Sequence, residues 1–414
     1  MAATGHSWAD LNSELLVSIA AAAAVQGSSL FYYECLRSIC AAWRSALPPP
    51  YPCLLSLNDD HARSASVFSF PMRRSFLLYK GFEGCLDVPE TPSCAGVFGS
   101  AGNGRLARVV GSGNGRLAVA MNSSIGKHTC VSFWTVSIFV LDPRAGDVVE
   151  LLPPRGPTNE VEDCMYVVRK LVFAPDPDDA TVVAMCGRGK IAYVDTSKSR
   201  SRRKLDLVWT TVDVIAWDTK RLVDLAFDAT GGKVYCLDSS GGMHVLRVHH
   251  GGQNSQEAPA ERSLTLLPAA AFDPPYNVAS TLTSTKHLFF CHGSLYQVWQ
   301  NDSSTIRLCS GLTMSADEIF VLRYDQDRQS WNVVKDLGGC SVFIGKNSSP
   351  AVVQAGTVLA VRSDCVYWID WRCVPMVCDL ATGTSKRCVF PGRAPKGNCW
   401  YFGDHNMRRT NSLM

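Results

Sequence analysis

Apolar residues near the amino terminus recur at the spacing of an α-helix. Leu11, Leu15 and Ile19 follow one another at intervals of four residues, which places them on one helical face. Asn12 and Ser13 offer side chains that can cap the start of this helix. A second stripe with helical spacing comprises Tyr32, Leu36, Ile39, Cys40, Trp43 and Leu47. The pattern predicts helical structure within residues 7–47.

Breaks in this pattern mark where the helices end. The segment Gln26–Ser29 interrupts the first apolar run and offers a new capping residue. The consecutive prolines Pro48 to Pro50 end the second stripe, because proline lacks an amide donor and disfavours helix in the residue before it. We therefore expect a helical hairpin of about 40 residues, which is too small to bury all of its own apolar surface.

Beyond about residue 52 the pattern changes to that of strands. Short runs rich in β-branched and aromatic residues lie between clusters of Gly, Pro, Asp and Ser. Few of them alternate with helical segments, which disfavours a parallel α/β sheet and predicts an all-β domain. The clearest runs are Val131–Leu141, Lys233–Leu237, Met243–Val248, Leu288–Trp299 and Cys365–Ile369.

A weak repeat suggests how these strands are organised. An Asp begins the turn after each of five strand-like runs, at Asp142, Asp195, Asp238, Asp325 and Asp379. The span from Asp195 to Asp238 is about half of the next span, and repeats of about 40–50 residues are typical of propeller blades. Residues 65–400 would then form about six or seven blades. Asp is common in turns of any fold, so the repeat alone does not establish a propeller.

The composition is that of a folded protein and identifies no partner. The 414 residues are 46% hydrophobic and 19% charged, with a formal net charge of +3, so no overall field favours nucleic acid or a membrane surface. The apolar run Leu15–Val25 is too short to span a bilayer. Asp10 and Glu14 beside it are the wrong flank for a secretion signal. We expect no membrane association.

The cysteines indicate a reducing compartment. There are 17 of them, an odd number, and no two are spaced as CxxC. A disulfide framework would be shorter and more regular. The nearest groupings are Cys365, Cys373 and Cys378, and His287, Cys291 and His292, and neither has the spacing of a zinc site. We expect reduced, mostly buried thiols, no bound metal, and a protein of the cytoplasm or nucleus.

No motif for catalysis or cofactor binding is evident. Gly113-x-Gly115-x-x-Ala118 has the glycines of a dinucleotide fingerprint, but the residues after it read as a strand and no βαβ unit follows. Gly345-Lys346-Asn347 lacks the hydroxyl with which a P-loop holds magnesium, and it reads as a turn. Neither a GxSxG nor an HExxH motif occurs. The expectation is a protein without cofactor or catalytic residues.

A basic run at residues 198–204 raises the question of nucleic acid. It could contact phosphates, but it lacks interleaved aromatic residues and any recognised reading motif. Nucleic-acid binding is therefore not expected. A solvated loop or a nuclear import signal remains open.

Two stretches of the helical segment resemble an F-box. The first runs from Trp8 to Ile19 through Leu11, Leu15 and Leu16, and the second is Leu36–Ala46, which contains Cys40 and Trp43-Arg44. In that family these apolar positions pack against the Skp adaptor of a Skp–cullin–F-box (SCF) ubiquitin ligase. The sequence departs from the family pattern at Asn12-Ser13, where Pro-Pro is usual, and in the longer connection around Gln26–Ser29.

The rest of the chain resembles the plant F-box proteins with a KIB-type β-propeller. The likeness covers nearly the whole chain, and its motifs occur in tandem order. It implies a mainly β fold with an F-box-like helical module at residues 1–50, a propeller at 51–402 and a flexible tail at 403–414. The stretches that carry it are Leu141–Gly146, Leu151–Pro154, Leu288–Val298, Ile319–Tyr324, Trp331–Gly339, Val342–Gly345 and Cys365–Asp370. Trp331 and Trp368 are expected in blade cores.

The resemblance implies a non-enzymatic subunit that recruits a client protein to an SCF ligase. The helical module would bind a Skp-type adaptor, and through it a cullin and a RING subunit, while the propeller would hold a client that the sequence does not identify. The residues predicted to dock on the adaptor are Trp8, Leu11, Leu15, Leu16, Ile19, Leu36, Ile39, Trp43 and Arg44.

Three alternatives remain open at this stage. The apolar residues of the module can pack within the hairpin or against the propeller instead of on an adaptor. The chain can be an interaction scaffold whose F-box no longer engages the ligase. It can also be a propeller enzyme, which would require convergent polar residues or a metal in the central channel.

Overall fold

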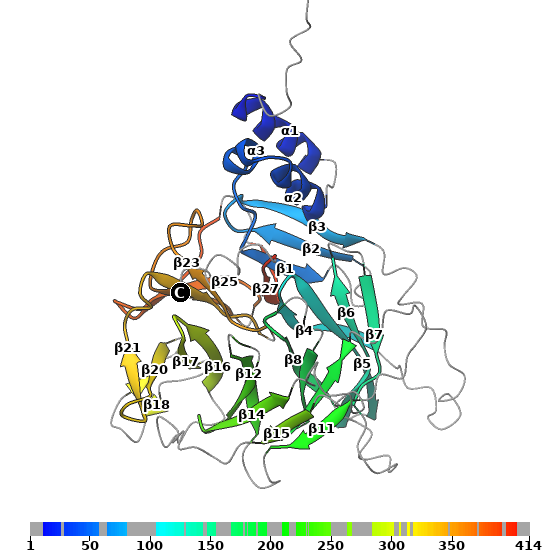
Figure 1. The fold of residues 1–414 in the computed structure, drawn as a ribbon, viewed down its shortest axis with the longest axis vertical. Coiled ribbons are helices and arrows are strands. Elements are labelled where there is room, and N and C mark those ends of the chain that lie inside the picture. Colours follow the sequence, from blue (N-terminus) through cyan, green and yellow to red (C-terminus); the bar gives the residue numbers. More distant parts are fainter. Residues whose placement is uncertain are drawn as a thin grey trace, which may run out of the picture.

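The structure is a computed structural model of the chain, and it shows a propeller with a helical module on its rim (Figure 1). The residues that it describes are 11–25, 29–57, 64–80, 105–127, 130–143, 147–154, 167–176, 179, 181–187, 189–196, 209–214, 221–228, 230, 232–249, 263–266, 284–301, 306–307, 313–314, 318–346, 348–370, 372–390 and 395–403.

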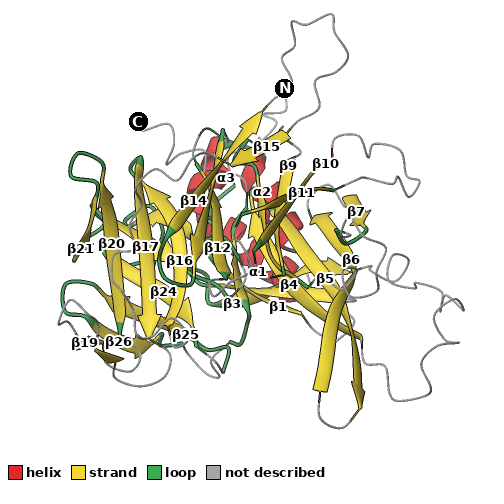
Figure 2. Ribbon diagram, turned by 90° about the horizontal axis from the view of Figure 1, so that it is seen from below, coloured by secondary structure: helices red, strands yellow, loops and turns green. Residues whose placement is uncertain are grey.

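The amino-terminal module contains three helices rather than the two of the predicted hairpin. These are α1 (Ser13–Val25), α2 (Leu30–Ser38) and α3 (Ala41–Ala46). The second apolar stripe is split at Cys40, whose backbone is extended and whose Sγ accepts the Trp43 amide hydrogen at 3.5 Å. Periodicity alone cannot detect this break, because the apolar spacing continues through it. Helices occur only in this module among the described residues, and strands form the rest (Figure 2).

The strands form six sheets arranged around a central axis, which confirms the predicted propeller and fixes six blades in the described part of the chain (Figure 1). From the axis outwards, blade 1 contains β27 (Cys399–Tyr401), β1 (Cys53–Leu57), β2 (Ser64–Ser69) and β3 (Arg74–Lys80); blade 2 contains β4 (Arg105–Gly113), β5 (Arg116–Lys127), β6 (Cys130–Asp142) and β7 (Asp147–Leu151); blade 3 contains β8 (Val168–Phe173), β9 (Thr181–Cys186), β10 (Lys190–Asp195) and β11 (Thr210–Asp213). Blade 4 contains β12 (Leu222–Phe227), β13 (Lys233–Asp238), β14 (Met243–His249) and β15 (Ser263–Leu266); blade 5 contains β16 (Ser284–Cys291), β17 (Ser294–Asn301), β20 (Ile319–Asp325) and β21 (Ser330–Val334). Blade 6 contains β23 (Ala351–Gln354), β22 (Cys340–Phe343), β24 (Cys365–Ile369), β25 (Pro375–Asp379) and β26 (Thr384–Arg387), and β18 (Ile306–Arg307) pairs separately with β19 (Thr313–Met314).

In blades 3, 5 and 6, burial falls from the middle strands to the outermost strand. Every residue of β9 is buried, as are all residues of β17 after Ser294, because neighbouring blades cover both faces of these strands. This explains why their sequences lack strict alternation. The outermost strand β26 is largely exposed and carries Lys386 and Arg387, and such charges oppose edge-to-edge pairing with other chains.

The carboxyl-terminal strand closes the ring. β27 pairs with β1, so that Trp400 lies opposite Leu54. The buried Trp400 ring contacts Phe343 of blade 6 edge-on at 5.0 Å between centroids. Its carbonyl accepts the Ser112 hydroxyl hydrogen of blade 2 at 2.8 Å. The last strand thus joins the first, second and sixth blades.

The Asp-led repeat is in phase with the blades at four of its five positions. Asp142, Asp195, Asp325 and Asp379 each end the strand next to the outer edge of a blade, namely β6, β10, β20 and β25. Asp238 instead ends β13, the second strand of its blade. The roughly one-to-two ratio of the spans on either side of Asp238 is therefore a coincidence, although the repeat length is of the right order.

The predicted strand runs and turns agree with the structure in most places. Leu288–Trp299 is a hairpin of β16 and β17 that turns at His292 and Gly293, which have φ values of 47° and 70°. Asn114 and Gly115 form the tip of the β4–β5 hairpin with φ values of 52° and 72°, so the glycine-rich motif is a turn as expected. The basic run at 198–204 and the tail from residue 404 lie outside the described residues.

Candidate functional site

The helical module is fixed to blade 1 through α2. The Tyr33 ring packs against Phe76 of β3 at 5.6 Å between centroids, and Ser29 forms an isolated β-bridge with Leu77. Leu30 and Tyr33 belong to the same hydrophobic cluster as the strands of blade 1. Because the core is continuous, the module and the propeller form one packed unit rather than two lobes joined by a free linker.

Polar contacts around the proline segment strengthen this attachment. The Tyr33 hydroxyl donates to the Pro48 carbonyl at 2.8 Å, and Arg37 Nε donates to the Leu47 carbonyl at 3.0 Å. The Tyr51 hydroxyl donates to Glu34 Oε1 at 2.5 Å. Burial raises the pKa of Tyr33 to about 12, against the opposing effect of Arg37, so this hydroxyl stays a donor across the physiological range. The segment that leaves the helices, from Leu47 to Tyr51, is therefore held against α2 by hydrogen bonds at both of its ends.

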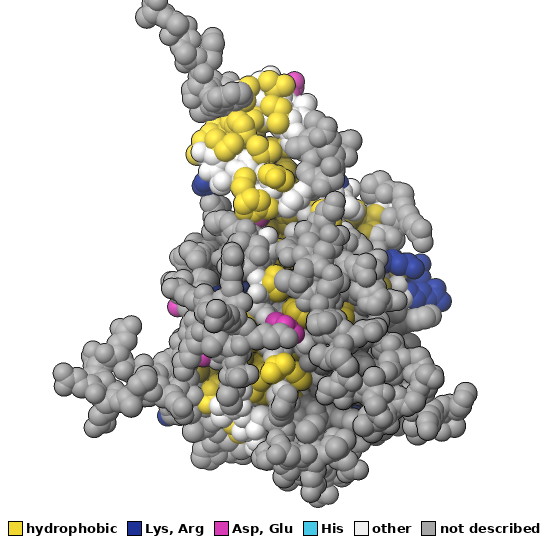
Figure 3. Space-filling model, turned by 90° about the vertical axis from the view of Figure 1, so that its right-hand side faces the viewer, with side chains coloured by type: hydrophobic (Ala, Val, Ile, Leu, Met, Phe, Trp, Pro, Cys, Tyr) yellow, Lys and Arg dark blue, Asp and Glu magenta, His cyan; other side chains and the backbone are white. Residues whose placement is uncertain are grey.

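One surface of the module is apolar and exposed (Figure 3). Among the described residues, ten large apolar side chains are well exposed, and six of them lie in this short module. They are Leu15, Val17 and Ile19 of α1, Phe31 and Tyr32 of α2, and Ile39 between α2 and α3. On α1, Leu15 and Ile19 lie one turn apart on one side, whereas Val17 lies on the other side of the helix. We use the name exposed helical face for the full set of six residues. A concentration of this kind on a small surface is typical of a protein interface.

The structure divides the predicted docking residues into three groups. Leu15, Ile19, Ile39 and Arg44 are exposed, whereas Leu11 and Leu36 are half-buried. Leu16 and Trp43 are buried, with 2% and 5% of their surface accessible, so they support the module from within. Trp8 lies outside the described residues.

Sequence reasoning missed two of the most exposed aromatic residues as docking candidates. Phe31 is 40% exposed and Tyr32 is 63% exposed. Tyr32 belonged to the predicted helical stripe, but neither residue was assigned to docking. The spacing of apolar residues along a helix shows which of them share a face. Only the packing of the helices against blade 1 shows which face stays exposed to solvent.

Of the two tryptophans expected in blade cores, one is buried there and the other is half-buried on an outermost strand. Trp368 of β24 is 3% exposed and lies in the cluster that joins blades 5 and 6. Trp331 of β21 is half-buried and its ring lies 5.1 Å from that of Tyr324.

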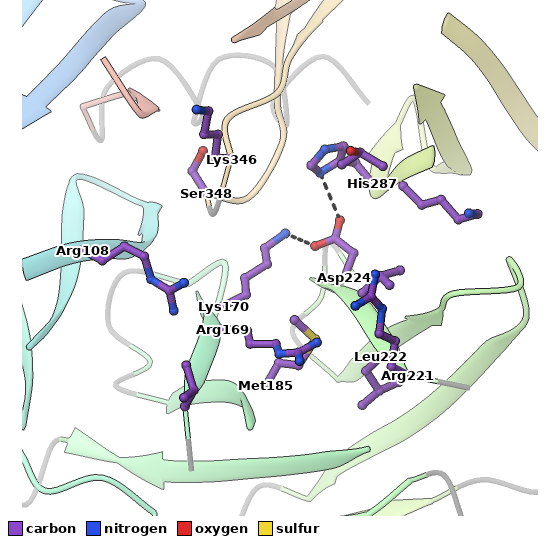
Figure 4. Close-up of a pocket in the computed structure, with 14 residues that line it drawn as sticks. Arg108, Arg169, Lys170, Met185, Arg221, Leu222, Asp224, His287, Lys346 and Ser348 are labelled. Carbon is purple, nitrogen blue, oxygen red and sulfur yellow. Dashed lines mark hydrogen bonds and ion pairs between the residues drawn. The ribbon is translucent and has the colours of Figure 1, made fainter. Parts of the chain in front are cut away.

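A second candidate site is a cavity of about 390 Å³ at the centre of the propeller (Figure 4). Its walls come from the beginnings of the innermost strands β8, β12 and β16, from β4, and from the loop after β22. The lining is rich in basic residues, and among its described residues Asp224 is the one that carries a carboxylate. The lining residues are Arg108, Val167, Arg169, Lys170, Met185, Arg221, Leu222, Val223, Asp224, Thr285, Lys286, His287, Lys346 and Ser348.

Asp224 is the structural centre of this cavity wall. Its carboxylate forms a buried ion pair with Lys170 of blade 3 and accepts the Leu288 amide hydrogen of blade 5 at 2.7 Å. It also accepts the Leu225 amide hydrogen at 2.9 Å, and His287 Nδ1 lies 3.8 Å away. The carboxylate therefore ties three blades together, and its charge is already compensated.

His287 is held in its neutral form. Burial lowers its pKa to about 4, and nearby Lys170 lowers it further, whereas Asp224 acts in the opposite direction. At neutral pH the imidazole adds no charge to the cavity.

Two of the six basic side chains point elsewhere. The Lys286 ammonium lies over the Trp299 ring, 4.5 Å from its centroid, and the exposed Lys346 donates to Cys373 Sγ at 3.5 Å. Arg108, Arg169 and Arg221 approach the cavity from three different sides (Figure 4). Burial lowers the pKa of Arg108, and the positive charge of Arg169 lowers it further.

A third group has the ligand types that zinc prefers. Cys291, His292 and Cys340 place their two Sγ atoms and an imidazole nitrogen within 4.8 Å of one another, across the boundary of blades 5 and 6. The Cys340 Sγ lies 3.3 Å from His292 Nε2, and it donates to Gln354 Oε1 at 3.1 Å. The hydrogen bond from Cys291 and the neighbouring His292 lower the pKa of the Cys340 thiol. The sequence could not reveal this group, because Cys340 is remote from the other two residues.

The fold defines a class, a six-bladed β-propeller with a helical module packed on its first blade. Residues 92–408 match the KIB1-4 beta-propeller, and the chain belongs to that family. The chain is also 20% identical over 377 residues to the Arabidopsis thaliana protein named "Putative F-box protein At5g60060", with 88% of each chain covered. The predicted resemblance is thereby confirmed. Among the described residues, no helix has both the length and the apolar character that a membrane span requires.

Solved structures are similar at a much lower level. The Cps50 (Swd1) β-propeller domain of Myceliophteria thermophila is 11% identical, covers 72% of this chain and 79% of its own, and has a TM-score of 0.32. Saccharomyces cerevisiae Sqt1 is 9% identical, covers 70% of this chain and 88% of its own, and has a TM-score of 0.31. At this level of similarity, the propeller assignment depends on the strand order described above.

Proposed function

We propose that the chain is a substrate-recruiting subunit of an SCF ubiquitin ligase, in which the helical module binds a Skp-type adaptor and the propeller binds a client protein. In this proposal the chain performs no catalysis itself, and ubiquitin transfer belongs to the other subunits. It acts in the cytoplasm, the nucleus or both. The observation that carries the proposal is the exposed helical face, which concentrates apolar surface at the segment that resembles an F-box.

The chemistry of this face suits a helical partner groove. Leu15 and Ile19 lie one turn apart on α1, and Ile39 is 54% exposed after the end of α2. Apolar anchors at such spacing fit a hydrophobic groove, and a few of them supply most of the binding free energy. Arg44 is exposed in the same module and can contribute a polar contact at the edge.

The rigid attachment of the module suits the role of an adaptor. Tyr33 and Phe76 join α2 to blade 1, and Tyr51 anchors the connecting segment. An adaptor bound to the helices would therefore hold the propeller at a fixed orientation. A client on the propeller would then be presented to the ligase in a defined geometry.

The proposal is tested by co-purification with a Skp-type adaptor. A Leu15→Asp/Ile39→Asp double variant removes two exposed anchors without disturbing the buried residues, so we expect complex formation to fall at least tenfold. Leu359→Asp is the matched control, because Leu359 is 69% exposed and lies between β23 and β24 of blade 6 rather than in the helical module. Retention of adaptor binding by the double variant would reject docking through the exposed helical face.

The alternative is an interaction scaffold that does not engage the ligase. The departure at Asn12-Ser13 motivates it, and Asn12 Oδ1 accepts the Glu14 amide hydrogen at 2.9 Å, so these residues serve to start α1. A wild-type chain that captures no Skp-type adaptor under conditions in which a reference F-box does so would favour the scaffold. Proximity labelling with and without proteasome inhibition separates the roles further, because ligase clients should accumulate only under inhibition.

A further inference from the structure

Two thiols and an imidazole meet at the boundary between blades 5 and 6. Cys291 is the last residue of β16, His292 follows it in the turn to β17, and Cys340 is the first residue of β22. Both cysteines are free thiols, and they are 3% and 2% exposed, whereas His292 is exposed. An ion can therefore reach this group from solvent on the side of the imidazole, while the two sulfur atoms lie inside the protein.

The three ligand atoms surround a common point. Each of them lies within 4.8 Å of the other two, and Cys340 Sγ is 3.3 Å from His292 Nε2. For any three atoms placed in this way, one point lies within about 2.8 Å of all of them, whereas zinc bonds are about 2.3 Å long to sulfur and about 2.0–2.1 Å long to nitrogen. Small rotations of the three side chains are therefore enough to bring all the ligand atoms to bonding distance of one ion.

The backbone around the group holds these side chains together. His292 and Gly338 have φ values of 47° and 65°. A Cβ at position 338 would lie 3.3 Å from His292 Nε2, so the glycine lets the segment before β22 come close to the imidazole. Asp364 Oδ1 accepts two backbone amide hydrogens of the same segment, at 2.7 and 3.1 Å. The segment that leads into Cys340 is thus fixed beside the turn of blade 5.

We propose that Cys291, His292 and Cys340 bind one zinc ion, with water as the fourth ligand. Thiolate and imidazole are the usual ligands of tetrahedral zinc, and two thiolates balance the charge of Zn²⁺. Binding releases the thiol protons to solvent. The proposal differs from the expectation of no bound metal, which considered only residues close together in the sequence and so omitted Cys340.

A bound ion would join two neighbouring blades of the ring. Two of its ligands come from blade 5 and the third from blade 6, and the chain between them is long. The unfolded chain does not hold these ligands together, so the free energy of zinc binding adds to the stability of the folded state. The site goes beyond the proposed ligase role, because it lies in the propeller and does not require adaptor binding.

Zinc binding is measured on the full chain, kept reduced and freed of metal with a chelator. Competition with a chromophoric chelator gives the number of Zn²⁺ ions bound and the Kd. Co²⁺ in place of Zn²⁺ identifies the ligands, because tetrahedral thiolate coordination gives strong visible absorption and a sulfur-to-cobalt charge-transfer band. Thermal unfolding with and without Zn²⁺ measures the stabilisation. Mg²⁺ is the control ion, since it prefers oxygen ligands.

Two variants remove one ligand each. His292→Asn removes the imidazole and keeps a residue type that tolerates a positive φ, so the turn should be preserved. Cys340→Ser removes one sulfur. His244→Asn and Cys373→Ser are the matched controls, because they change a half-buried histidine and a half-buried cysteine outside the group.

We expect the wild-type chain to bind Zn²⁺ with a Kd below about 1 μM and to gain Tm on binding. Each ligand variant should bind at least about a hundredfold more weakly, because loss of an outer-shell partner alone costs about 10–100-fold. The control variants should bind as the wild type does.

Three results would overturn the proposal. The first is a wild-type chain that binds Zn²⁺ no more tightly than Mg²⁺. The second is equal binding by the ligand variants and the control variants, which would mean adventitious uptake by other thiols. The third is a disulfide between Cys291 and Cys340 in freshly isolated protein, detected by peptide mass spectrometry. None of these results bears on adaptor docking, which co-purification measures separately.

Discussion

The buried carboxylate of Asp224 should contribute more to stability than any exposed ion pair of this chain. Asp224 and Lys170 are 1% and 4% exposed, and both lie where three blades meet. An Asp224→Asn substitution keeps the shape of the side chain but removes its charge. It leaves the Lys170 ammonium buried beside a neutral amide, and it leaves one fewer strong acceptor for the Leu225 and Leu288 amides.

The expected loss is about 3–5 kcal/mol of unfolding free energy, which is the range for a buried pair that loses one partner. Equilibrium unfolding in urea measures it, with the m-value as a check that the unfolding transition is otherwise unchanged. Lys170→Met should cost less than Asp224→Asn, because the carboxylate keeps two backbone donors.

A double-mutant cycle separates the ion pair from the effects of each single change. The Lys170→Met/Asp224→Asn variant should be more stable than the sum of the single losses predicts, by about 1 kcal/mol or more. A loss below about 1 kcal/mol for Asp224→Asn, or strict additivity in the cycle, would refute the assignment of this pair as the joint between blades.

Three further predictions concern buried positions. The His287 pKa lies near 4, below the ordinary 6.5, so the unfolded chain takes up the proton first as the pH falls. Stability should drop by roughly 3 kcal/mol between pH 6.5 and 4, and urea unfolding across this range should show a smaller drop for His287→Gln. Gly111→Ala would place a Cβ 2.3 Å from the Leu171 carbonyl oxygen of the next blade, whereas Gly113→Ala meets only ordinary contacts; the first should lower the Tm by several degrees more than the second. Trp43→Ala should cost about 3–5 kcal/mol through lost packing, and an unchanged urea midpoint would contradict its burial.

The sequence alone determined the local elements and the class of fold. Leu15 and Ile19 predict a helix because their spacing of four residues matches one helical turn. Asn114-Gly115 predicts the turn of the β4–β5 hairpin, because these two residue types readily adopt the positive φ values of such a turn. These signals depend on residues close in the chain. They predicted the change from helix to strand near residue 52 and, together with the resemblance, the propeller.

Only the tertiary structure decided which apolar residues remain exposed. Leu15 and Leu16 are neighbours in the same apolar run, yet one is 49% exposed and the other 2%. The difference arises because the helices pack against one another and α2 packs against β3, whose side chain Phe76 meets Tyr33. Which strand of its blade Asp238 ends likewise depends on the pairing of strands, and the local sequence pattern carries no information about that pairing.

The central cavity was beyond the reach of sequence patterns for the same reason. Arg108, Asp224 and Ser348 are far apart in the chain, and they meet because each lies in or beside the innermost part of a different blade. The thiol and imidazole groups of Cys340 and His292 meet at a blade boundary in the same way. Local periodicity determined that strands form, whereas the closure of the ring by long-range pairing determined which charged groups share its centre.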